Sequence, residues 1–140
     1  MLVLGGADLD RAAEAIAVGG FANSGQLCMS AKRIVVERAV WEELSPRLEP
    51  AVESHVNGPP EHPQTHVVPL GPRRARDLSE AHIDQALDRG GSVVAGSANG
   101  CGEVPVIVQI PADATDIGLW REESFGPVRS LVLAEDAEHA

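Results

Sequence analysis

Short apolar runs alternate along the chain with longer stretches of helical periodicity. The short runs lie at 2–4, 33–37, 92–96, 104–110 and 128–134, and they are rich in Val, Ile and Leu. Runs of this length, bounded by glycine, proline or charged residues, are typical of strands buried within a sheet. The pattern therefore predicts five strands.

The first helical stretch lies at 9–18, where apolar residues recur every three or four positions. Asp8 is a suitable N-cap because its side chain can accept a hydrogen bond from a first-turn amide. Gly19-Gly20 follows directly, and glycine is common just after a helix. We therefore expect one helix that stops at these two glycines.

A second helical pattern covers 41–52 and contains Pro46 and Pro50, so a kinked or broken helix is expected there. A third helix is expected over 73–89. The segment between them, 57–72, holds five of the ten prolines and is expected to be a loop.

Apolar strands that alternate with helices favour an α/β domain with a largely parallel sheet flanked by helices on both faces. A chain of 140 residues is long enough for one such domain. Sheets of this kind hold their functional sites on loops beyond the strand ends. Two loops fit that position: "GGFANSGQLC" (19–28) and "REESFGPV" (121–128).

The charge balance narrows the choice of partners. Eleven Lys and Arg residues against 21 Asp and Glu residues give a formal net charge of −10. Such a surface repels polyanions, so neither nucleic acid nor an anionic membrane is expected as a partner. The chain has two cysteines, Cys28 and Cys101, and no apolar run near the ~18 residues that span a bilayer. We expect a reduced, cytoplasmic protein.

Histidines and the second cysteine give weaker signals. His62 and His66 stand four apart, which suits two metal ligands on a helix, but the prolines around them preclude a helix. No metal site is therefore expected. His82 is expected to be a histidine with satisfied hydrogen bonds in a helix, and Cys101 an exposed loop thiol.

Cys28 is the strongest chemical candidate. The turn before it can place Cys28 near the start of a short helical turn, where backbone amides favour a thiolate and can bind an oxyanion. Lys32 and Arg33 add positive charge nearby. The alternative is a structural thiol buried in the core.

The residues around Cys28 resemble those of a known family. "FANSGQLC" (21–28), followed by "KRIVV", resembles the active-site segment of the aldehyde dehydrogenase superfamily, Phe-x-Asn-x-Gly-Gln-x-Cys before a basic residue and a strand. "REESFGPV" (121–128) is similar to the family's Glu-Glu-x-Phe-Gly-Pro-Val segment. The elements between the two segments follow the family's order, so the resemblance covers nearly the whole chain.

The resemblance implies a fold, a reaction and three site residues. Residues 1–140 would form part of an aldehyde dehydrogenase-like catalytic domain, without the cofactor-binding domain and the C-terminal oligomerisation segment. The implied reaction oxidises an aldehyde to a carboxylic acid with NAD or NADP. Cys28 would be the nucleophile that forms a thiohemiacetal and then a thioester, and its amide would bind the oxyanion. Glu123 would hydrogen-bond the nicotinamide ribose, and Phe125 would contact the nicotinamide end.

Several parts of the family's machinery have no match in the sequence. The general-base glutamate belongs to a Glu-Leu-Gly-Gly segment, and "LGG" (4–6) lacks the glutamate. The asparagine oxyanion donor, the lysine of the adenosine site and the glycine-rich cofactor loop are also unmatched. General-base help is typically worth ~10²–10⁴-fold, so the chain alone is expected to be weakly active or inactive. Local departures from the family's pattern are Leu27, Ser30, Trp120, Arg121 and Ser124.

Three functions stay open from the sequence. They are aldehyde oxidation through Cys28, a non-catalytic remnant or assembly piece that keeps the fold, and a thiol-dependent esterase. The substrate of the first would be a small aldehyde. The macromolecular partner would be either a second copy of the chain or a complementing chain that carries the cofactor domain.

Overall fold

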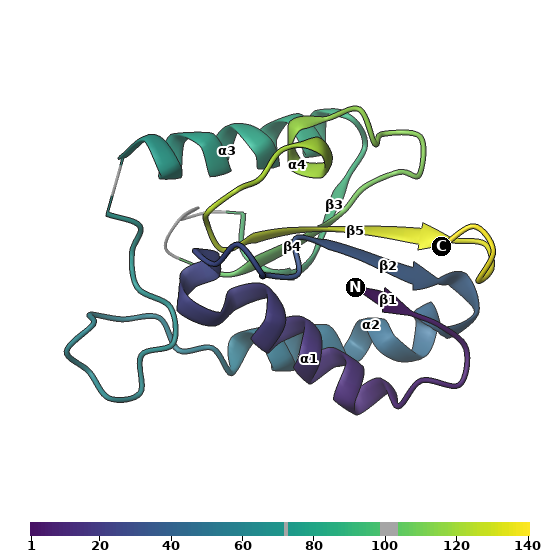
Figure 1. Cartoon of the computed structure of the whole chain (residues 1–140), viewed down its shortest axis with the longest axis horizontal. Helices are drawn as coiled ribbons and strands as arrows, with labels where there is room; N and C mark the ends of the chain where they lie inside the picture. Colours follow the sequence, from purple (N-terminus) through teal and green to yellow (C-terminus); the bar gives the residue numbers. More distant parts are fainter. Residues whose placement is uncertain (72, 99–103) are drawn as a thin grey trace.

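Five strands form one sheet at the centre of the molecule. The structure, a computed structural model, describes residues 1–71, 73–98 and 104–140. Its strands are β1 (Leu2–Val3), β2 (Arg33–Glu37), β3 (Ser92–Gly96), β4 (Val106–Gln109) and β5 (Val128–Ala134), in the order β1-β2-β5-β4-β3 (Figure 1). β3 runs antiparallel to β4, and every other neighbouring pair is parallel. The predicted largely parallel sheet is confirmed.

Helices cover both faces of this sheet, as predicted. α1 (Leu9–Phe21) and α2 (Arg38–Glu53) lie on one face, and α3 (Arg73–Asp88) and the short α4 (Gly118–Arg121) lie on the other (Figure 1). Each face has its own apolar core. Ile16, Ile34 and Leu131 belong to the first cluster, whereas Ile83 and Val108 belong to the second. The sheet therefore forms the middle of three layers.

α1 begins as expected but ends later. The Asp8 side chain accepts a hydrogen bond from the Arg11 amide at 3.1 Å, which is the predicted cap. The helix continues through Gly19-Gly20 to Phe21, which is fully buried. A Cβ on Gly20 would lie 3.3 Å from Cγ of Arg129, so the absence of a side chain there serves close packing. The prediction that the glycines stop the helix is wrong.

α2 runs from Arg38 to Glu53 as one helix, so the expected break at Pro46 and Pro50 does not occur. Both prolines are exposed, on the side away from the buried Leu44. Water can therefore bond the carbonyls that the prolines leave without an amide donor.

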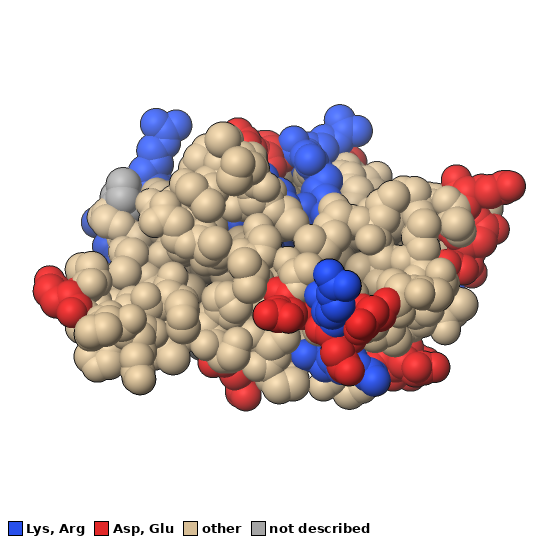
Figure 2. Space-filling view, turned by 60° about the horizontal axis from the view of Figure 1, so that its bottom comes forward, with Lys and Arg blue, Asp and Glu red and all other residues tan. Residues whose placement is uncertain are grey.

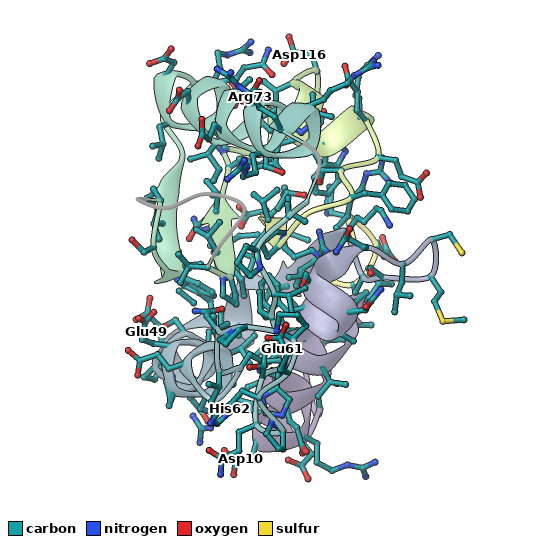
Figure 3. All side chains as sticks on the ribbon, turned by 90° about the vertical axis from the view of Figure 1, so that its left-hand side faces the viewer. Asp10, Glu49, Glu61, His62, Arg73 and Asp116 are labelled. Carbon is teal, nitrogen blue, oxygen red and sulfur yellow. The ribbon has the colours of Figure 1, made fainter. Side chains whose placement is uncertain are left out.

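The outer surface is acidic and unevenly charged. Figure 2 shows acidic side chains toward the right-hand end of the face that it draws, a further acidic group at the left edge, and a broad area without charged side chains left of centre. Figure 3 shows Arg73 and Asp116 on the α3 side and Asp10 on the opposite, α1–α2 side. Among the described residues, no helix combines the length and apolarity that a bilayer span requires.

Candidate active site

The two loops singled out in the sequence meet at one edge of the sheet. The segment with Cys28 leads into β2, and the segment with Glu123 and Phe125 leads into β5. β2 and β5 are parallel neighbours, with Arg33 paired to Ser130. Both loops therefore lie at the amino ends of their strands, whereas sites of parallel sheets are more often found at the carboxyl ends.

The backbone before Cys28 is tightly constrained. A 3₁₀ turn, η1 (Ala22–Gly25), follows α1, and three consecutive residues in it have positive φ: Asn23 at 51°, Ser24 at 59° and Gly25 at 71°. The Ser24 hydroxyl accepts a hydrogen bond from the Val68 amide at 2.8 Å and lies 3.1 Å from the Val68 carbonyl, to which it donates. The expected loop 57–72 is thereby attached to the segment that precedes Cys28.

Cys28 lies in a hydrogen-bonded turn and is exposed. The Ser30 amide donates to the Leu27 carbonyl at 3.2 Å, which places Cys28 and Met29 at the tip of the turn. The helical turn of this segment ends at Gly25, so the expected position of Cys28 at a helix start is wrong. A structural thiol buried in the core is also excluded.

Lys32 joins the two loops. Its ammonium donates to the Leu27 carbonyl at 2.8 Å and lies 3.4 Å from Oε1 of Glu123. The same nitrogen lies 5.1 Å from the centre of the Phe125 ring. Lys32 is 11% exposed at its side chain, whereas the side chain of Glu123 is 55% exposed. The structure therefore gathers the Cys28 turn, Glu123 and Phe125 around one cation.

A buried arginine connects the same two loops from below. Arg129 is fully buried, and its guanidinium donates to the carbonyls of Gly20 at 2.7 Å, Gly25 at 3.2 Å and Gly126 at 2.9 Å. No ion pair of Arg129 occurs in the described part of the chain. Burial lowers the pKa of Arg129 to about 10. Sequence reasoning missed this residue, because an arginine within an apolar strand run gives no signal that its partners are backbone carbonyls.

Arg33 fixes the start of β2 to α4. Its guanidinium donates to the carbonyls of Trp120 and Arg121, and it stacks over the Trp120 ring at 5.9 Å. The Arg33 guanidinium therefore faces α4. The cation that contacts Glu123 is Lys32.

The other candidates lie away from this edge. His82 is buried, and its Nε2 lies 3.4 Å from Glu122, but its Nδ1 has no hydrogen-bond partner in the described structure. The expectation that its hydrogen bonds are satisfied is therefore wrong for one nitrogen. No cluster that could hold a metal ion occurs among residues 1–71, 73–98 and 104–140. Cys101 lies outside the described residues.

Comparisons with known proteins place this geometry in a family. The sequence matches the Aldehyde dehydrogenase family over residues 1–140. A succinate-semialdehyde dehydrogenase [NADP(+)] of Deinococcus radiodurans is 35% identical over 99% of the chain. A vanillin dehydrogenase of Pseudomonas fluorescens is 36% identical over the whole chain. The chain spans 30% and 29% of the lengths of these two relatives.

Solved structures agree on the fold. An NADP-dependent glyceraldehyde-3-phosphate dehydrogenase from Bacillus halodurans, complexed with NADP, superposes over 99% of the chain with a TM-score of 0.88 and 29% identity. An NAD-dependent benzaldehyde dehydrogenase from Corynebacterium glutamicum gives a TM-score of 0.86 and 34% identity over 99% of the chain. The chain covers 29% and 30% of these two structures. The chain belongs to the aldehyde dehydrogenase family.

Proposed function

We propose that this chain contributes the nucleophile and the nicotinamide-side residues of an enzyme that oxidises a small aldehyde to a carboxylic acid with NAD or NADP. The observation that carries the proposal is the gathering of the Cys28 turn, Glu123 and Phe125 around Lys32. Relatives that match the whole chain are named for the oxidation of aldehydes. A free thiol as nucleophile suits the reducing cytoplasm.

Cys28 has the exposure that a nucleophile needs. Its thiolate attacks the aldehyde carbonyl carbon, a carbon–sulfur bond forms, and the carbonyl electron pair moves to oxygen. The Cys28 amide donates to this oxygen in the thiohemiacetal. Once the carbon is oxidised, Cys28 holds the acyl group as a thioester, and water releases the acid and restores the thiol.

Glu123 and Phe125 have the chemistry for the nicotinamide end of the cofactor. The Glu123 carboxylate can accept hydrogen bonds from ribose hydroxyls, and its side chain is 55% exposed. The Phe125 ring is 43% exposed and can pack against a flat heterocycle. When bound, the cofactor supplies the hydride acceptor. The residues present therefore fit this end of NAD or NADP.

A complete reaction needs groups that we do not assign within these 140 residues. A general base must activate the water that cleaves the thioester, and a nucleotide-binding fold must hold the rest of the cofactor. We propose that further protein segments, either covalently continuous with this one or on a complementing chain, supply both. The chain alone would then be weakly active or inactive.

Alkylation of the thiol tests the proposal without cofactor. The purified chain is treated with iodoacetamide at pH 7, with and without benzaldehyde, and the labelling of Cys28 and Cys101 is followed by peptide mass spectrometry. We expect benzaldehyde to slow the labelling of Cys28 by about threefold or more and to leave Cys101 unchanged, because a thiohemiacetal blocks the thiolate.

Two cysteine variants serve as controls for the labelling experiment. C28S should abolish the benzaldehyde-sensitive labelling, and C101S should retain it. Equal labelling of both cysteines with no protection by benzaldehyde would contradict a nucleophilic Cys28 and favour a non-catalytic remnant. Hydrolysis of a simple thiol-reactive ester by wild type but not by C28S, without protection by the aldehyde, would favour an esterase.

A further inference from the structure

Lys32 occupies an unusual place for a lysine. Its side chain is largely buried, and its ammonium contacts three different kinds of group: a backbone carbonyl, a carboxylate and an aromatic ring. The carbonyl belongs to Leu27, directly before Cys28, whereas the carboxylate of Glu123 and the ring of Phe125 come from a segment more than ninety residues away. Lys32 thus connects the two segments with one atom.

The chemistry of an ammonium suits this junction. An ammonium presents three N–H donors around a compact charge, so it can address a carbonyl and a carboxylate that lie in different directions. A guanidinium has a planar fork that matches a single carboxylate better. At 11% exposure, the cation is screened by water less than a surface lysine, whereas the carboxylate of Glu123 is 55% exposed.

The neighbouring cations are engaged elsewhere. Arg33 donates to the carbonyls of Trp120 and Arg121, and Arg129 donates to glycine carbonyls beneath the loops. In the described part of the chain, Lys32 is therefore the cation that contacts Glu123. It is also the only lysine in the sequence.

Hydrogen bonds to its backbone carbonyl fix the main chain of Lys32. The Ser130 amide and the Ser130 hydroxyl both donate to the Lys32 carbonyl, each at 3.2 Å. Because Ser130 belongs to β5, the backbone of Lys32 is fixed to the strand that follows Glu123 and Phe125. The ammonium and the backbone of Lys32 thus join the same two segments independently.

We propose that Lys32 is a positioning residue that sets the orientation of the Glu123 carboxylate and of the turn that carries Cys28. The roles of Cys28 and Glu123 rest on the proposed function, whereas the link through Lys32 rests on the contacts alone. Loss of the ammonium releases the Leu27 carbonyl and leaves Glu123 free to rotate into solvent.

The single lysine allows a direct test by NMR. The full chain is labelled with [¹³C,¹⁵N]-lysine, which gives one side-chain signal, and the pH is lowered through the range in which carboxylates become protonated. We expect the Lys32 ¹³Cε signal to shift with an inflection as Glu123 is protonated, in the pH range where circular dichroism shows the chain folded. E123Q should remove that inflection.

E122Q is the matched control, because the adjacent Glu122 lies 3.4 Å from His82 instead of Lys32. It should leave the Lys32 inflection in place. An inflection that persists in E123Q, or that E122Q removes, would overturn the proposed link. This readout requires neither aldehyde nor cofactor, so it can succeed where the proposed function fails.

Alkylation of Cys28 gives the second readout. We expect K32M to change the rate at which Cys28 is labelled at pH 7 by about threefold or more relative to Cys101, because the Leu27 carbonyl before Cys28 loses its contact with the ammonium. K32R keeps the charge, but its planar fork cannot address the carbonyl and the carboxylate equally well, so it should restore the wild-type rate only in part. A labelling rate of Cys28 that is unchanged in K32M would overturn the positioning of the Cys28 turn, even if wild-type Cys28 is protected by aldehyde.

Discussion

The guanidinium of Arg129 reaches from the β5 strand to the carbonyl of Gly20, 2.7 Å away, near the end of α1. A cation at the carboxyl end of a helix is favoured by the helix dipole. The same guanidinium donates to Gly25 and Gly126, one in each of the two loops. Arg129 is therefore the internal tie between the end of α1, the Cys28 segment and the Glu123 segment.

Replacement of Arg129 should destabilise the fold. R129M removes the donors of several buried carbonyls, and each unsatisfied group costs about 1–3 kcal/mol, partly offset because a buried charge is removed. We expect a net loss of about 2–4 kcal/mol in the free energy of unfolding, measured by urea denaturation. R38M, at an exposed ion pair with Glu135, should unfold at nearly the wild-type urea concentration.

The lowered pKa of Arg129 also predicts a dependence on pH. Because burial lowers the pKa to about 10 in the folded state, the unfolded chain holds more protons between about pH 10 and 12. The stability of wild type relative to R129M should therefore rise as pH increases through 10. A difference that stays constant between pH 8 and 11.5 would contradict the lowered pKa of Arg129.

Alanine variants of Gly25 and Gly6 distinguish the cost of a positive φ from the cost of a steric clash. Both have positive φ, 71° and 84°, but a Cβ on Gly25 would collide with the Arg129 guanidinium and the Gly126 carbonyl oxygen, whereas one on Gly6 meets open space. We expect G6A to lower the free energy of unfolding by about 1 kcal/mol and G25A by about 3 kcal/mol or more. Similar losses in the two variants would show that the Gly25–Gly126 approach relaxes easily.

Asp116 should titrate at unusually low pH. The hydrogen bond from Arg89, 3.2 Å from Oδ2, lowers the pKa of the Asp116 carboxyl below its ordinary value of 3.8. Its contribution to stability is therefore present above pH 3.8 and is lost as the pH falls through the lowered value. We expect R89Q to move the titration of the Asp116 ¹³C-carboxyl signal back toward 3.8. An unchanged titration would assign the shift to the local backbone.

His82 should be replaceable with little loss. Its Nδ1 is buried without a partner in the described structure, so the folded state already carries a desolvation penalty at that atom. We expect H82L to change the free energy of unfolding by less than about 1 kcal/mol, whereas the neighbouring I83A should cost about 2–4 kcal/mol. A loss in H82L as large as in I83A would show that the contact of His82 with Glu122 stabilises the fold.

Periodicity predicted the sheet and most helix positions, because apolar runs and helical spacing report directly which side of an element is buried. It failed at Gly19-Gly20 and at Pro46 because local propensity was overridden by tertiary context. Gly20 is needed for the close approach of Arg129, and Pro46 lies on a solvated face. The approach of Arg129 to Gly20 cannot be read from the local sequence, whereas the exposed position of Pro46 follows from the spacing of Leu44 and Leu48.

The candidate site was predictable only in part. The motifs identified Cys28, Glu123 and Phe125, but not the residues that hold them together. Lys32 was noted only as nearby charge, since its contacts depend on a segment far along the chain. Arg129 gave no signal at all, because its partners are backbone carbonyls, which every residue type has.

The hydrogen bonds from Ser130 to the Lys32 carbonyl have a consequence for variation among related chains. The residues between these two positions include α2, the proline-rich loop and α3, yet the hydrogen bonds that align the two loops lie at the ends of that interval. Insertions or deletions at exposed turns of the interval, away from the Ser24–Val68 contact and from the paired strands, can therefore accumulate in descendant sequences without moving the cysteine turn relative to the glutamate. The number of residues between the two motifs can therefore change, while the distance between the two loops in the folded structure stays the same.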